Sequence, residues 1–376
     1  MIDVKDFYDE LIDNKIKFFT GVPDSLLKPL CNYLMCEYGN DTKHHIIAAN
    51  EGNAVGIASG YYLSTSKIPL VYMQNSGQGN MINPYASLTQ EKVYGIPQIF
   101  VIGWRGEPGK KDEPQHVFQG EITLSLLDVL EIPYFVITKE SKYNDIKEAM
   151  DKFNKYLSIG RSIAFVISKG ALSYDGVVHY ENPYKFKREN ILEHIVNIVQ
   201  DDIIVSTTGK TSRELFEIRE RLGSSHKYDF LTVGSMGHSS SIALGIAQQK
   251  PNKRVWCIDG DGAAIMHMGA MGVIGQAKPS NLVHIVINNE AHESVGGFPT
   301  AGQNIHLVDV AKACGYKNVA TISNIEQIEE DLKHIISCEG LTFVEIKSAI
   351  GSRSDLGRPT STPQENKEIF MKFLTE

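Results

Sequence analysis

The sequence predicts an α/β protein with two doubly wound parallel-sheet domains. Short runs of β-branched and aromatic residues alternate with helical patterns along nearly the whole chain, which is typical of parallel strands joined by helices. The β runs fall into two sets of about six, and two sheets of that size are more common than one oversized sheet. A polar stretch that carries Pro183 separates the two sets. We therefore expect a first domain over 1–175, a linker over 176–190 and a second domain over 191–376.

The expected strands follow the chain in order, each ending at a polar or glycine-rich turn. In the first domain they are 18–20, 46–49, 70–74, 98–103, 134–137 and 163–168. In the second domain they are 203–207, 230–233, 255–259, 282–288, 319–322 and 342–347.

Composition narrows the class of protein. The 376 residues, 42% of them hydrophobic, are enough for two or three domains with full cores. A formal net charge of −8 argues against a nucleic-acid-binding surface. Nowhere do 18 apolar residues run together, and the first residues lack a basic region, so we expect neither a membrane span nor a secretory signal. The 5 cysteines form no CxxC motif or Cys/His cluster, which indicates reduced thiols in a cytoplasmic protein.

The stretch 254–300 predicts a binding site for a metal and a diphosphate. Gly260-Asp261-Gly262 ends one expected strand, a helix is expected to run from there to Pro279, and the next strand ends at Asn288-Asn289. The handedness of such units makes the strands parallel neighbours, so their carboxyl ends bring Asp261 and Asn289 together. Oxygen ligands of these types suit Mg²⁺, and glycines before a helix start suit a phosphate. A surface turn and a phosphotransferase aspartate are the alternatives; a calcium loop is excluded, because its series of ligands does not follow.

Three turns of the first domain carry polar groups where strands end. Asp24 follows the first strand and either caps the next helix or faces the ligand crevice. Glu51 ends the second strand and opens a helix rich in small residues, where a carboxylate could simply complement the helix dipole. Asn75 lies in a glycine-rich loop for which ordinary turn chemistry is the alternative.

The loop after the expected strand 98–103 is the most polar of the first domain. It gathers Arg105, Lys110, Lys111 and His116. These side chains are either solvated or arranged to bind an anionic substrate. A histidine with an ordinary pKa could also shuttle protons near neutrality.

Three loops of the second domain are further candidates. A strand ending in Thr207-Thr208-Gly209 can offer donors to a diphosphate, although it is not a P-loop, because position 204 is Ile where that motif needs Gly. Met236 lies between glycines before a helix of small residues, and a core methionine is the alternative. Arg353 and Arg358 flank a loop near the end of the chain, where they are either solvated or close over a doubly charged substrate group.

Several segments together resemble the phosphonopyruvate decarboxylase family, which belongs to the thiamine diphosphate-dependent 2-oxo acid decarboxylases. They are GVPDSLL, ANEGNAVGIASGYYL, QNSGQGNMINPYASL, GWRGEPGKKDEPQH, GSMGHSSSIALG, GDGAA, NNEAHESVGGFPT and GSRSDLGRPT. The resemblance covers nearly the whole chain. It implies a pyrimidine-binding domain followed by a diphosphate-binding domain. It also implies a homodimer or higher homo-oligomer whose active sites form between chains.

The resemblance also implies roles for individual residues. Asp261, Asn289 and the backbone carbonyl of Ala291 would hold Mg²⁺. Glu51 would activate the cofactor, and Met236 would wedge it into a bent shape. Asp24 and His116 are the other catalytic candidates. The remaining expected cofactor contacts are Thr208, Gly209, Ser235, Gly260, Gly262 and Ala263. The expected substrate contacts are Asp24, Asn75, Arg105, His116, Ser294, Arg353 and Arg358.

The implied reaction is the decarboxylation of 3-phosphonopyruvate to phosphonoacetaldehyde and CO₂. A sulfopyruvate decarboxylase and a noncatalytic cofactor-binding subunit are the alternatives. Two positions depart from the better-known pyruvate decarboxylase pattern, in which a histidine pair stands at Gln115 and His116 and a glutamate at Val295. His292 and Glu293 are the nearest replacements for that glutamate, and the sequence does not place them.

Overall fold

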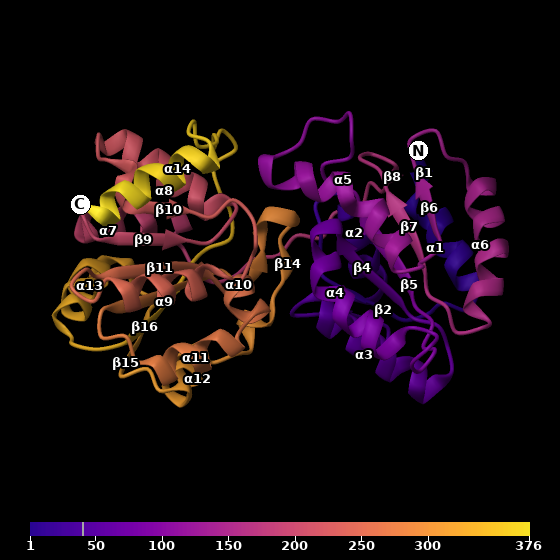
Figure 1. Cartoon of the computed structure of the whole chain (residues 1–376), viewed down its shortest axis with the longest axis horizontal. Coiled ribbons are helices and arrows are strands. Elements are labelled where there is room, and N and C mark those ends of the chain that lie inside the picture. The colour runs from indigo at the N-terminus through magenta and orange to yellow at the C-terminus, as the bar shows by residue number, and fades with distance from the viewer. Residues whose placement is uncertain (40) are drawn as a thin grey trace. The chain divides into compact units, whose positions relative to one another are not determined.

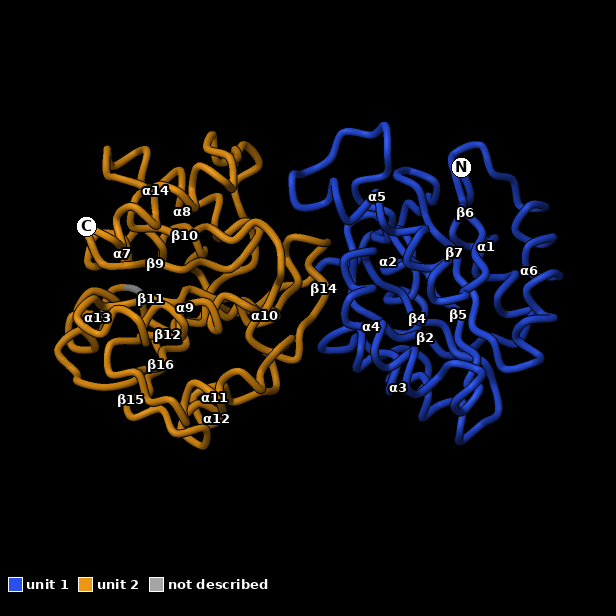
Figure 2. Tube along the Cα trace, in the orientation of Figure 1, with its two compact units in different colours: residues 1–179 blue, residues 180–376 orange. Residues whose placement is uncertain are grey.

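The computed structural model describes residues 1–39 and 41–376, and the chain divides into two compact units, Met1–His179 and Tyr180–Glu376 (Figure 2). The division lies inside the segment 176–190. Each unit holds a six-stranded sheet, and every neighbouring pair of its strands is parallel (Figure 1). The predicted fold class is therefore confirmed. Among the described helices, none is both long and apolar enough to cross a membrane.

Unit 1 is built on the sheet β3-β2-β4-β5-β7-β6. Its strands are β2 (Phe19–Gly21), β3 (His45–Ile47), β4 (Leu70–Gln74), β5 (Ile99–Gly103), β6 (Tyr134–Ile137) and β7 (Ile163–Ile167). Its α-helices are α1 (Val4–Asp13), α2 (Lys28–Tyr38), α3 (Glu51–Thr65), α4 (Gln78–Pro84), α5 (Pro114–Val129) and α6 (Tyr143–Leu157). A small sheet joins β1 (Ile2–Asp3) to β8 (Leu172–Ser173). It was not predicted, because two residues are too few to show a strand pattern.

Unit 2 is built on the sheet β10-β9-β11-β12-β16-β15. Its strands are β9 (Ile203–Ser206), β10 (Asp229–Leu231), β11 (Val255–Gly260), β12 (Leu282–Asn288), β15 (Asn318–Ile322) and β16 (Thr342–Lys347). Its α-helices are α7 (Arg188–Val199), α8 (Lys210–Leu222), α9 (Ser239–Gln249), α10 (Asp261–Met266), α11 (Gly269–Ala277), α12 (Leu307–Cys314), α13 (Ile328–Ser337) and α14 (Pro363–Thr375). A hairpin of β13 (Ala291–His292) and β14 (Phe298–Pro299) follows β12. Taken in chain order, the six strands of each main sheet are arranged in the same sequence, second-first-third-fourth-sixth-fifth.

The predicted strands lie within two residues of the observed ones. One expected helix is wrong: the segment between Gly262 and Pro279 forms two helices, α10 and α11. The backbone of His267 leaves the helical region with φ −130° and ψ 45°. Glycines at 269, 272 and 275 weaken the helical preference of this segment. Gly275 in α11 packs so closely on the Cys314 carbonyl that a side chain would collide with it.

Helices cover both faces of the unit 2 sheet, and strand residues alternate between two cores. Trp256 and Ile258 of β11 pack with residues of α7, α8 and α13. Val255 and Cys257 of the same strand pack with residues of α9, α11, α12 and α14. Burial on both faces explains why the strands are nearly continuous apolar runs. It also leaves the strand ends as the places where polar side chains gather.

A buried ion pair fastens α8 to β10 in unit 2. Arg219 is 1% exposed and Asp229 is 0% exposed. Arg219 Nε and Nη2 each donate to one oxygen of Asp229, both at 2.9 Å. Removing one partner of such a pair leaves an uncompensated charge in the core.

Replacing Arg219 by Met should therefore destabilise the protein strongly. We expect a loss of about 3–5 kcal/mol in the free energy of unfolding, because Asp229 would stay buried without its partner. Urea unfolding followed by circular dichroism measures it. The matched control is Arg221→Met, which breaks the half-exposed pairs with Glu189 and Glu193 and should cost at most about 1 kcal/mol. Equal losses of unfolding free energy in the two variants would contradict the role assigned to the buried ion pair.

Candidate active site

The ends of β11 and β12 meet at Asp261. The two strands pair in parallel with Gly260 opposite Ile287, so the residues that follow them are neighbours. The Asp261 carboxylate accepts a hydrogen bond from the backbone N–H of Asn289 and another from the Thr300 hydroxyl. Asp261 is 2% exposed, and burial raises its pKa to about 6, because the charged form loses its hydration. The juxtaposition expected from the sequence is present.

The side-chain amide of Asn289 is held at both ends. Its Nδ2 donates to Glu293 Oε2 at 2.9 Å, and its Oδ1 accepts the Ala291 backbone N–H at 3.2 Å. Ala291 is buried in β13, opposite Pro299 of β14. Asp261, Asn289 and Ala291 thus lie within one turn-and-hairpin assembly that offers oxygen atoms.

Two glycine-containing turns lie beside this assembly. Gly209 has φ 89°, a conformation that favours glycine, and it directly precedes α8. A Cβ on Gly209 would lie 3.9 Å from the Cβ of Ser294, so the Thr208-Gly209 turn and Ser294 are neighbours. Gly260 has open space around the position of a side chain. The first N–H groups of α8 are a suitable site for an anion.

Met236 lies over the start of α10. A Cβ added to Gly262 would lie 3.3 Å from Met236 Cε, and one added to Gly237 would lie 3.0 Å from the Ala263 carbonyl oxygen. Ser235 has a left-handed φ of 55°, and its hydroxyl is 3.1 Å from His238 Nδ1. The structure therefore brings these predicted cofactor residues against the loop that carries Asp261.

A charged network surrounds Glu293 and was missed in the sequence. Glu293 is bonded to Arg188 at 3.2 Å and to Lys210 at 3.0 Å, and Arg188 also donates to Glu214 at 2.6 Å. Burial alone would raise the pKa of Glu293, but the charges of Arg188 and Lys210 lower it to about 2. Arg188, Lys210 and Glu214 are far from Glu293 in the sequence, so their contacts could not be predicted. The position of Glu293, four residues after Asn289, is the only sequence signal that points to it.

In unit 1, Glu51 is a buried acid at the first residue of α3. It is 5% exposed. Asn80 Nδ2 donates to its Oε2 at 2.7 Å. Gly77 lies so close that any side chain there would collide with the Glu51 carboxyl group. Burial raises the pKa of Glu51, and the hydrogen bond from Asn80 only partly offsets that effect.

Asp24 is a second buried acid of unit 1, with 0% exposure. Gln74 Nε2 donates to its Oδ1 at 2.6 Å, and the Leu26 N–H donates to its Oδ2 at 3.0 Å. The interpretation of Asp24 as the cap of the next helix is wrong: α2 begins at Lys28, and the residue before it has no capping side chain. Burial raises the pKa of Asp24 despite these hydrogen bonds.

Arg105 lies beside Asp24 and is fixed by its neighbours. Its guanidinium is paired with Asp112 and donates to Ser25 Oγ at 2.9 Å. The Asn75 amide donates to the Arg105 carbonyl at 2.7 Å and accepts its N–H at 3.2 Å. His116 is mostly buried, and burial, with the charge of Arg105, lowers its pKa to about 4. His116 is therefore neutral near pH 7, and its pKa is not the ordinary one considered above.

Arg353 is committed to carboxylates inside unit 2. It pairs with Glu189, Glu217 and Asp355, so an anion could bind its guanidinium only by displacing them. Arg358 is exposed on the same loop. The structure does not bring Arg353 to a free binding position.

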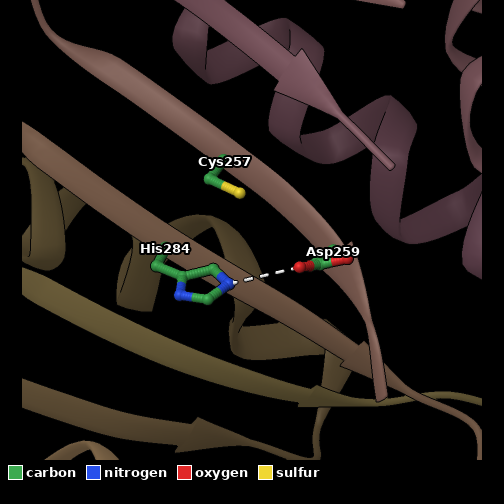
Figure 3. A group of neighbouring side chains, drawn as sticks. All are labelled: Cys257, Asp259 and His284. Atoms are coloured by element: carbon green, nitrogen blue, oxygen red, sulfur yellow. Dashed lines mark ion pairs between the residues drawn. The ribbon is translucent and has the colours of Figure 1, made fainter. Parts of the chain in front are cut away.

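A separate group of possible metal ligands lies inside the unit 2 sheet (Figure 3). Cys257, Asp259 and His284 are all buried, and their ligand atoms lie within 4.8 Å of one another. Asp259 Oδ2 faces His284 Nε2 at 3.7 Å, while Asp259 Oδ1 accepts the Gly260 N–H at 3.1 Å. Asp259 and His284 thus face each other from the neighbouring strands β11 and β12.

Comparisons with known proteins identify the family of the chain. Residues 4–129 match the N-terminal TPP-binding domain of thiamine pyrophosphate enzymes, and residues 207–346 match the C-terminal one. The chain is 32% identical to a phosphonopyruvate decarboxylase of Streptomyces viridochromogenes, covering 100% of this chain and 96% of that protein. It is 30% identical to one of Streptomyces hygroscopicus, with 100% and 95% covered. A sulfopyruvate decarboxylase of Methanosarcina acetivorans is 28% identical over 86% of each.

The two domain matches fall in the two structural units, and the two Streptomyces relatives match from end to end. The chain is therefore a thiamine diphosphate-dependent decarboxylase and belongs to the phosphonopyruvate decarboxylase family.

Proposed function

We propose that this enzyme converts 3-phosphonopyruvate to phosphonoacetaldehyde and CO₂ with thiamine diphosphate and Mg²⁺. The observation that carries the proposal is the end-to-end similarity to two phosphonopyruvate decarboxylases. The similarity to a sulfopyruvate decarboxylase is lower and covers less of the chain. Sulfopyruvate is therefore the second candidate substrate, since a sulfonate and a phosphonate make similar demands on a binding site.

The residues around Asp261 fit a bound Mg²⁺. We propose that Asp261, Asn289 and the Ala291 carbonyl hold it, because Mg²⁺ prefers such oxygen ligands. Asp261 is nearly completely buried, with its pKa raised by the loss of hydration. A cation beside it would offset that cost. The Thr208-Gly209 turn, Ser294 and the start of α8 would then receive the diphosphate.

Thiamine diphosphate, when bound, supplies the electron sink for the negative charge left by loss of CO₂. The protein supplies two buried acids, Glu51 and Asp24, whose pKa is raised by burial, so each holds a proton more readily than an exposed carboxyl group does. Glu51 Oε2 accepts a hydrogen bond from Asn80, and we assign the exchange of the activating proton to this carboxyl group. The overall reaction consumes one proton, and we assign its delivery to the carboxyl group of Asp24. A neutral His116 is less suited to this role.

Arg105 is the candidate for recognising the phosphonate. It lies beside Asp24, and its charge acts on that carboxyl group. Its partner Asp112 holds the guanidinium in place. Arg353 is the weaker candidate, because it is paired with three carboxylates, whereas Arg105 is paired with one.

We further propose that the active enzyme is a homodimer or larger, with Glu51 of one chain completing the Asp261 site of another. The resemblance to thiamine diphosphate enzymes is the main support. Large apolar side chains exposed on unit 1 add to it, since such residues favour association. They include Val93, Tyr94, Val117 and Phe118.

Replacing either buried acid by its amide should slow turnover without removing the cofactor. We expect Glu51→Gln and Asp24→Asn each to lower kcat by about 100-fold or more, which is the usual contribution of a positioned acid or base. His116→Gln should slow turnover less than Asp24→Asn. CO₂ release measures kcat, and calorimetry checks that thiamine diphosphate still binds. Normal turnover of Glu51→Gln would rule out its assigned role.

The substrate proposal is tested by comparing phosphonopyruvate, sulfopyruvate and pyruvate in one CO₂-release assay. We expect the highest kcat/KM with phosphonopyruvate. Arg105→Met should raise KM for phosphonopyruvate by about 10-fold or more, because a charge-assisted bond is lost, and should change KM for pyruvate much less. A higher kcat/KM with sulfopyruvate would show that sulfopyruvate is the substrate. An equal rise of KM for phosphonopyruvate and for pyruvate in Arg105→Met would show that Arg105 does not recognise the phosphonate.

A mixing experiment tests the shared site. Glu51→Gln and Asp261→Asn should each have only a small residual activity alone. In a homodimer with sites between chains, half of the dimers formed by random exchange are mixed and one of their two sites is intact, giving about one quarter of wild-type activity. No recovery after verified subunit exchange would place both residues of a site on one chain.

A further inference from the structure

We propose that Glu293 is a positioning residue that fixes the amide of Asn289 so that its oxygen is available to the metal. The inference rests on the proposed Mg²⁺ site. Glu293 stands four residues after Asn289, in the short turn Glu293–Val295. None of the family roles described above assigns it a function. The contacts of its carboxylate indicate a function.

The two neighbours of the Asn289 side chain allow only one orientation of the amide. An ionised carboxylate can only accept hydrogen bonds, so the group 2.9 Å from Glu293 Oε2 must be the NH₂. A backbone N–H can only donate, so the group 3.2 Å from the Ala291 nitrogen must be the oxygen. If the amide were flipped, its oxygen would face the Glu293 carboxylate and its NH₂ would face the Ala291 N–H, and neither pair could form a hydrogen bond. The oxygen keeps a second lone pair for a further partner.

Glu293 can do this because it is itself fixed and charged. Lys210 Nζ is 3.0 Å from Oε1, and Arg188 Nη1 is 3.2 Å from Oε2. The Gly351 N–H also donates to Oε2, at 3.2 Å. Glu214 holds Arg188 from the other side with hydrogen bonds of 2.6 and 2.8 Å. These contacts come from three separate segments of unit 2, namely α7, α8 and the loop that carries Gly351, so the carboxylate has little freedom to move.

This arrangement gives Glu293 a different task from an acid that meets the substrate. Both of its oxygens already accept hydrogen bonds from the protein, and its carboxylate is paired with Arg188 and Lys210. It is therefore unsuited to replace the glutamate that stands at Val295 in pyruvate decarboxylases. Removing a residue that hydrogen-bonds to a metal ligand commonly lowers the metal affinity by about 10–100-fold.

Metal binding tests the inference directly. We expect Glu293→Ala to raise the Mn²⁺ dissociation constant, measured by electron paramagnetic resonance with thiamine diphosphate present, by about 10-fold or more. Glu290→Ala is the matched control: it removes the same charge from the residue next to Asn289, and its carboxylate contacts Tyr184 instead of the amide. The control should stay within about twofold. An equal loss in both variants would show a general charge effect and overturn the inference.

A double-mutant cycle separates orientation from a loss of folding. Aspartate presents oxygen in either orientation, so Glu293→Ala should not weaken Mn²⁺ binding in an Asn289→Asp background. Equal weakening in both backgrounds would overturn the positioning role, because it would not depend on the amide. If the wild-type protein fails to bind Mn²⁺ with thiamine diphosphate, the proposed function itself fails. If the wild type binds and Glu293→Ala binds equally well, only the inference fails.

Discussion

The parallel pairing of β11 and β12 is the constraint on which the site depends. It places the residue after Gly260 next to the residue after Asn288. The Asp261 carboxylate is buried there against the backbone of Asn289. Burying a charged carboxylate without a cation costs free energy. The groups around it are N–H groups and oxygen atoms that could bind a metal. The Met236 contact with Gly262 lies directly beside this junction.

In the proposed function, the two units divide the chemistry between them. Both have the same strand order, yet they place different groups at their strand ends. Unit 1 carries the buried acids Glu51 and Asp24, each shielded by a glycine that leaves no room for a side chain. Unit 2 carries the Asp261 and Asn289 pair. A decarboxylase needs both proton transfer and an anchored cofactor, and neither unit offers the full set.

Local features made the strands and the Asp261 site predictable. Strand runs and the turns after them depend on nearby residues, so β4, β12 and the neighbours Asp261 and Asn289 could be inferred. Features set by distant partners could not. The Glu293 network joins segments that are far apart in the chain, and the carboxylates around Arg353 do the same. The low pKa of His116 depends on burial, which leaves no pattern in the sequence.

Calorimetric titration of thiamine diphosphate into the metal-free protein is the most direct test of the central claim. We expect saturable binding of one cofactor per chain when Mg²⁺ is present, and much weaker binding in EDTA. We also expect Asp261→Asn with Mg²⁺ to bind the cofactor as weakly as the wild type does without the metal. Binding that is equally strong with and without a divalent metal, or no binding at all, would contradict the account.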